Sequence, residues 1–152
     1  MRAISLIETP EVQTAAFMYA VGGITVEVRV ADSRLVPELA RPRSAFPAGP
    51  GDPDVVVDVA WDESIERSAG ELLFDSGDSW RLYREPAGLR FDSTASVFEH
   101  GPYRVATVDE AFARVDVRLD ARLRDAGRVF DPLEFPLEEI VLLGYRARGR
   151  GV

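Results

Sequence analysis

Few residues in this sequence have the types and spacing that catalysis or metal binding requires. His100 is the single histidine, and it lies in a turn-like run between Phe98 and Pro102. One histidine cannot form a histidine-rich metal site, and no partner is spaced around it as in a known catalytic triad. We therefore predict that His100 is a loop residue.

Two short acidic clusters could suggest calcium binding, one mixed with serines and one made of closely spaced aspartates. They are Asp75, Ser76, Asp78 and Ser79, and Asp52, Asp54 and Asp58. Neither cluster has the twelve-residue loop that ends in a glutamate ligand. The composition of the first predicts a plain β-turn. Acid–base pairs could arise among any of the twenty-six acidic residues, but proximity in space selects the pair and sequence cannot.

Several kinds of chemistry are excluded by composition. The chain has no cysteine, and its eighteen basic residues are all arginine. Disulfides, thiolate metal sites, Schiff-base lysines and the lysine of a phosphate-binding loop are therefore excluded. The Gly22-Gly23 pair and the glycines at 149 and 151 lack the spacing of a dinucleotide fingerprint. We assign no catalytic, cofactor-binding or metal-ligating residue and expect no cofactor.

The aromatic residues could line a pocket but more often form a core. They are Trp61, Trp80, Tyr83, Phe91, Phe98 and Tyr103. The formal net charge of -8 disfavours nucleic acid as a partner, because an acidic surface repels phosphate backbones. The longest apolar run, residues 15–24, is much shorter than the roughly 20 residues that span a bilayer. With no signal-peptide core at the N-terminus, we expect a cytoplasmic protein without membrane contact.

Period-two alternation of apolar and polar residues predicts most of the fold. It is clear at 24–30, and at 54–61 it places Val55, Val57 and Val59 on one face. At 113–123 apolar residues alternate strictly with charged ones. Further strands are predicted at 71–74, 79–85, 88–92 and 102–108. For the pattern at 113–123, a helix over 109–124 is the alternative. We predict an α+β, mainly β fold: one domain over 1–152 with an antiparallel sheet or sandwich of about seven or eight strands.

Two segments depart from this pattern. Residues 32–53 are rich in proline and predict a surface loop, held to the core by Leu35, Val36, Leu39 and Phe46. Residues 136–148 predict the one C-terminal helix, with Pro136 at its first position, acids in its first turn and arginines in its last.

The C-terminal run FPLEEIVLLGYRARGRGV, residues 135–152, resembles the segment before the kinase core in bacterial proteins related to HPr kinase/phosphorylase. In that family a helix of this kind ends in a glycine–arginine turn. A histidine-bearing strand and a phosphate-binding loop follow it. The strand at 23–30, the proline-rich loop with Phe46 and the strand at 53–57 are similar to its β-rich N-terminal region. The family's catalytic residues lie beyond Val152, so none is carried onto this chain.

The resemblance implies a non-catalytic N-terminal accessory domain. It would pack against the kinase core, of the same polypeptide or of another protein, and help present a substrate or partner. The helix at 136–148 would then connect to that core, with an apolar side that packs on a missing neighbour or forms a homodimer. A free-standing binding module is the alternative, and a small enzyme whose carboxylates meet only in space is a third hypothesis.

Overall fold

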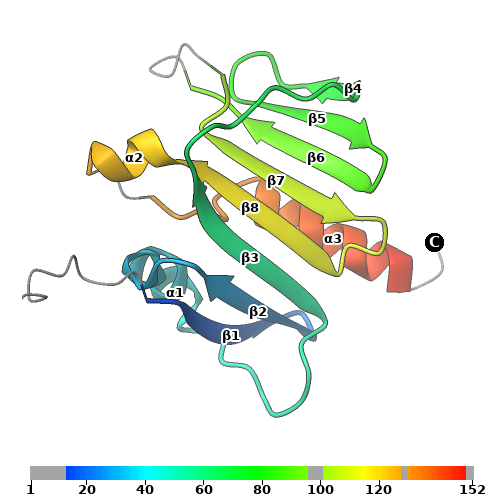
Figure 1. Ribbon diagram of the computed structural model, residues 1–152. Coiled ribbons are helices and arrows are strands. Elements are labelled where there is room, and N and C mark those ends of the chain that lie inside the picture. Colours follow the sequence, from blue (N-terminus) through cyan, green and yellow to red (C-terminus); the bar gives the residue numbers. More distant parts are fainter. Residues whose placement is uncertain (1–12, 96–100, 128–129, 150–152) are drawn as a thin grey trace, which may run out of the picture.

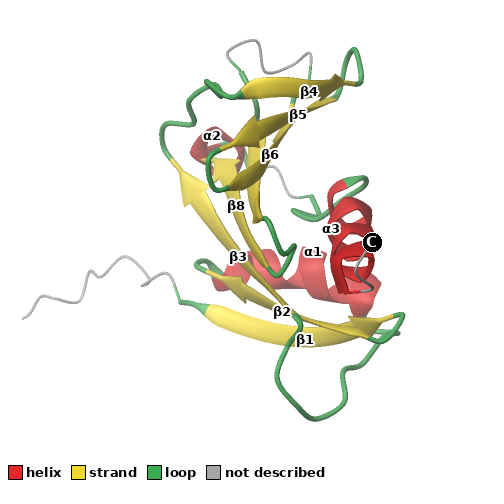
Figure 2. Cartoon of the chain, turned by 90° about the vertical axis from the view of Figure 1, so that its right-hand side faces the viewer, coloured by secondary structure: helices red, strands yellow, loops and turns green. Residues whose placement is uncertain are grey.

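The computed structural model describes residues 13–95, 101–127 and 130–149. In these residues eight strands form one mixed sheet, and the sheet curves around the side on which the C-terminal helix lies (Figures 1 and 2). The fold is α+β and mainly β, as predicted. The strands are β1 (Ala15–Val21), β2 (Ile24–Val30), β3 (Val55–Asp62), β4 (Glu71–Asp75), β5 (Trp80–Glu85), β6 (Gly88–Ser93), β7 (Arg104–Asp109) and β8 (Arg114–Asp120).

The strand order β1-β2-β3-β8-β7-β6-β5-β4 corrects the predicted antiparallel sheet or sandwich. Strand β3 is parallel to β2 on one side and to β8 on the other, whereas the remaining pairs are antiparallel. Parallel neighbours require a long crossover. Residues 31–54 supply it between β2 and β3, while β8 joins β3 from far along the sequence. Helices cover one face in place of a second sheet.

The alternating strands place their apolar residues on the face that carries α3 (Leu137–Gly149). The core residues from the three central strands are Ile24, Val26, Val28, Val30, Val55, Val57, Val59, Val115, Val117 and Leu119. We call the opposite, charged face of the sheet the outer face. The pattern at 113–123 is a strand only to Asp120, whose carboxylate accepts a hydrogen bond from the Arg122 backbone N–H and caps α2 (Ala121–Asp125). The alternative helix over 109–124 is therefore wrong, except for this last turn.

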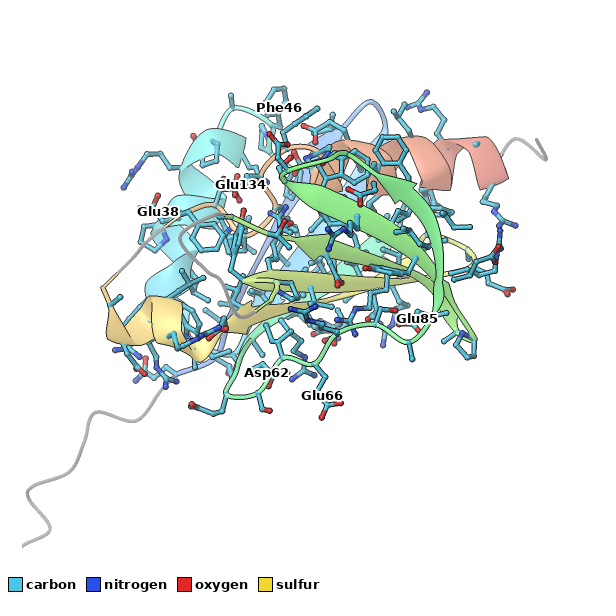
Figure 3. The ribbon with its side chains drawn as sticks, turned by 90° about the horizontal axis from the view of Figure 1, so that it is seen from above. Glu38, Phe46, Asp62, Glu66, Glu85 and Glu134 are labelled. Carbon is cyan, nitrogen blue, oxygen red and sulfur yellow. The ribbon has the colours of Figure 1, made fainter. Side chains whose placement is uncertain are left out.

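The first half of the proline-rich connection is helical, whereas residues 44–54 form the predicted loop apart from an isolated bridge at Pro47. It contains η2 (Ser33–Leu35), α1 (Val36–Ala40) and η3 (Arg41–Arg43), and prolines occupy early positions of α1 and η3. A proline has no N–H to lose there, so it can start a helix. Leu35 and Leu39 are buried in the core as predicted, but Phe46 is exposed. Figure 3 shows Phe46 at the surface, on the side of the molecule opposite Asp62 and Glu66.

Asp32 fixes the start of this connection. Its buried carboxylate accepts hydrogen bonds from the backbone and side chain of Arg34 and from the Trp61 indole N–H at 3.0 Å. The hydrogen bonds from the Arg34 side chain, helped by those from Trp61 and the Arg34 backbone, lower the pKa of Asp32 to about 2. Because this value lies below the ordinary one, the ionised carboxylate stabilises the fold above about pH 4. That contribution is lost as the pH falls toward 2.

Replacing Asp32 with asparagine is expected to lower the free energy of unfolding at pH 7 by about 1 kcal/mol, because the amide can still cap η2 but loses the charge that strengthens the hydrogen bonds from the Arg34 side chain. The variant should also lose less stability than the wild type between pH 4 and pH 2. Urea denaturation at pH 7, 4, 3 and 2 measures both effects. Parallel pH curves for the two proteins would show that Asp32 is not a source of the acid sensitivity.

Helix α3 confirms the prediction for 136–148 to within one residue at each end. The apolar side of α3 packs on this chain's own sheet, because Leu137 and Val141 are buried in the core. Leu143 points away from the core and is 68% exposed. None of the helices in the described part of the chain is long and apolar enough to cross a membrane.

Candidate protein-binding surface

Carboxylates and arginines meet on the outer face. The backbone register aligns Arg29, Asp58 and Asp116 across β2, β3 and β8. The outer face has two shallow depressions of about 320 Å³ and 640 Å³, and each of them is lined by Asp58 and Asp116 together. Asp116 is paired with Arg118 at 2.9 Å. This face brings two aspartates together, which is the arrangement that the small-enzyme hypothesis requires, but their neighbours include arginines that neutralise charge.

Asp92 is a buried carboxyl group on the same face. Burial raises the pKa of Asp92, and its ion pair with Arg90 at 2.7 Å opposes that shift. Arg90 also donates to the backbone carbonyl of Glu66, in the connection between β3 and β4. Asp92 is not among the residues that line either depression. Its contacts therefore tie a connection to the sheet.

Residues of the two short acidic clusters make local hydrogen bonds. Asp54 accepts hydrogen bonds from the Thr25 backbone N–H and the Tyr145 hydroxyl, and so joins β2 and α3. Asp75 accepts from the Gly77 N–H in the turn between β4 and β5, as the sequence predicts for a turn. Within residues 13–95, 101–127 and 130–149, no group of three or more histidines and acids is placed to hold a metal ion. His100 and Phe98 lie outside the described residues.

Aromatic residues of β4, β5 and β6 pack against one another. Trp80 stacks on Phe91 at 5.0 Å between ring centroids and on Phe74 at 4.7 Å. Phe91 belongs to the core, whereas Trp80 is half-buried and Phe74 is exposed. The stack therefore runs from the core out to β4, the last strand of the sheet.

Strand β4 is an edge strand whose apolar residues remain exposed. Leu72, Leu73 and Phe74 are 50%, 38% and 49% exposed. Sequence reasoning predicted a strand at 71–74 but not its exposure. The short continuous apolar run Leu-Leu-Phe is consistent with a fully buried strand, so the residue types alone carried no signal of this exposure. Contiguous exposed apolar residues on a sheet edge are typical of protein-binding sites.

The two edges of the sheet differ. At the β1 edge, the Ala20 N–H donates to the Phe46 carbonyl at 2.9 Å, and Pro47 forms a bridge with Tyr19. At the β4 edge, no backbone hydrogen bond within the described part of the chain reaches residues 71–75 from outside the β4–β5 ladder. Among the described residues, the β4 edge, defined as residues 71–75, is thus the sheet edge without a backbone partner.

Comparison with known proteins found no similar protein. The sequence matches no protein-family model, and neither a curated protein nor a solved structure was found to match it.

Proposed function

We propose that this chain is a non-catalytic accessory domain that binds another protein, the kinase core of an HPr kinase-like protein. The observation that carries the proposal is the exposed apolar β4 edge, because Leu72, Leu73 and Phe74 are all exposed. The resemblance of residues 135–152 to the segment before such a kinase core supports the choice of partner.

The β4 edge can supply the energy that binding requires. Full burial of a leucine or phenylalanine side chain contributes roughly 1.5–3 kcal/mol. Leu72 and Phe74 are already about half buried, so covering the remainder would contribute about 1 kcal/mol each. Together they account for a factor of about 30 in affinity.

Helix α3 is the surface that the sequence favoured for docking or for a homodimer. Its buried face now packs on the chain's own sheet, and the exposed Leu143 is the apolar residue it offers to a partner. Leu143 therefore provides a matched control for the β4 edge: it is at least as exposed, equally apolar and placed on the rival surface.

The test is the affinity of the purified chain for the separately purified kinase core of an HPr kinase-like protein from the same genome, measured by titration calorimetry. The double variant Leu72→Ser, Phe74→Ser is expected to weaken binding about 30-fold. Leu143→Ser should bind as the wild type does. Absence of binding by the wild type, or loss of binding in Leu143→Ser alone, would contradict the proposal.

The free-standing binding module would use the same β4 edge with a different partner. The small enzyme would depend on Asp58 and Asp116, which the sheet register places side by side. These two readings are separated from the accessory domain by the same titration, since both predict no affinity for the kinase core.

A further inference from the structure

We infer that the partner binds by adding a strand of its own to the β4 edge, and that this strand has an apolar centre between basic ends. The inference rests on the proposed protein-binding function and specifies how the surface is used. Its first support is the contrast between the two sheet edges. The β1 edge is occupied by Phe46 and Pro47, while the β4 edge has no such cover within the described residues. An extended peptide that pairs with a free edge gains backbone hydrogen bonds along its length.

The side chains of β4 offer a contact on each face of the sheet. Leu72 lies opposite Tyr83 on the outer face, and Phe74 lies opposite Leu82 on the face that carries α3. Phe74 also continues the aromatic stack with Trp80. Side chains of an added strand alternate between the two faces, so apolar residues of the partner would cover both Leu72 and Phe74.

The charges at the ends of β4 select the partner's end residues. Glu71 and Asp75 flank the apolar centre and are exposed, at 3.4 Å and 3.0 Å from Arg84 and Arg81 of β5. These arginines lie on the β5 side, so the carboxylates can accept further cations from the open side. A strand with arginine or lysine at its ends would complement both acids.

A second copy of this chain is a poor occupant. In an antiparallel self-pair centred on Leu73, Glu71 of each copy would lie opposite Asp75 of the other, and like charges in that position are destabilising. The bulge at Leu73 also puts Glu71 on the face of Arg84 and Asp75 on the face of Arg81, which are opposite faces of the sheet. Opposed residues of a strand pair share a face, so the bulge of β4 also conflicts with a self-pair centred on Leu73.

The probe is a synthetic hexapeptide with arginine at both ends and four valines between them, so that an extended strand presents valines and one arginine on each face of the sheet. We expect it to bind the intact chain with a Kd below about 1 mM and to slow amide exchange at residues 71–75 at least threefold, with no change at residues 15–21. A peptide N-methylated at alternate residues on its pairing edge should lose binding at least tenfold. The same peptide with glutamate at its ends should bind about fivefold more weakly.

Three results would overturn the inference: no binding of the arginine peptide, equal binding of the N-methylated peptide, or protection elsewhere than at 71–75. If the kinase core nevertheless binds in a manner that depends on Leu72 and Phe74, strand addition is excluded and the proposed function stands. If the peptide adds to β4 but the kinase core does not bind, the edge is a strand-binding site and the accessory function falls.

Discussion

Replacing Arg43 with alanine is expected to lower the free energy of unfolding by about 3 kcal/mol, because it leaves two carboxylates without their cation. The Arg43 side chain is 6% exposed and lies 2.8 Å from Glu138 and 3.0 Å from Asp131. It also donates to the Leu39 carbonyl at 2.7 Å. One guanidinium thus joins the crossover, the segment before α3 and α3 itself. The carboxylates are partly exposed, so we place the loss at the lower end of the range for a broken buried pair.

Arg41→Ala is the matched control for this prediction. Arg41 is two residues away on η3, is mostly exposed, and approaches Glu38 only to 3.9 Å. Its removal should change stability by less than about 0.5 kcal/mol. Urea denaturation at pH 7 measures both variants. Equal stability of Arg43→Ala and Arg41→Ala would show that the buried network does not hold α3 on the sheet.

Replacing Arg104 with methionine is expected to destabilise the fold by about 2–4 kcal/mol, through carbonyl groups left without donors. Arg104 is 1% exposed and lies over the Phe91 ring. Its guanidinium donates to the Ser93 hydroxyl at 2.8 Å, and to the carbonyls of Pro132 and Glu134 at 3.0 Å and 3.3 Å. Burial lowers the pKa of Arg104, so the loss of hydrogen bonds is partly offset by removal of a poorly solvated cation.

Thermal unfolding followed by circular dichroism measures this effect. At this chain length a loss of 1 kcal/mol lowers Tm by about 3 °C, so a fall of roughly 6–12 °C is expected. Arg118→Met, at a half-exposed position of the outer face, is the control and should shift Tm by no more than about 2 °C. A Tm for Arg104→Met within that margin would mean that water replaces the guanidinium at the two carbonyls.

Local pattern was enough to predict the parts of the fold that local physics decides. The alternation at 24–30 and 54–61 predicted β2 and β3, and the composition at 136–148 predicted α3. These elements can be recognised from the spacing of their apolar residues and from the residues at their ends. The short helices between β2 and β3 were missed because their prolines were interpreted as loop residues, although a proline early in a helix is compatible with its first turn.

The order of the strands and the roles of single arginines could not be predicted from the sequence, for a different reason. The parallel pairing of β3 with β2 and β8, and the place of β4 at an edge, depend on contacts between segments far apart in the chain. The exposure of Leu72 and Phe74 follows from that place and not from their residue types. Arg43 and Arg104 were likewise indistinguishable from sixteen other arginines until their partners, from distant segments, were known.

Amide hydrogen exchange of the intact chain, with and without the kinase core of an HPr kinase-like protein, shows directly which surface of the domain the partner covers. Binding is expected to slow exchange at residues 71–75 of β4 and to leave residues 15–21 of β1 and the surface around Leu143 unchanged. Protection that is centred on α3 or on the outer face, with β4 exchanging as in the free chain, would contradict this expectation.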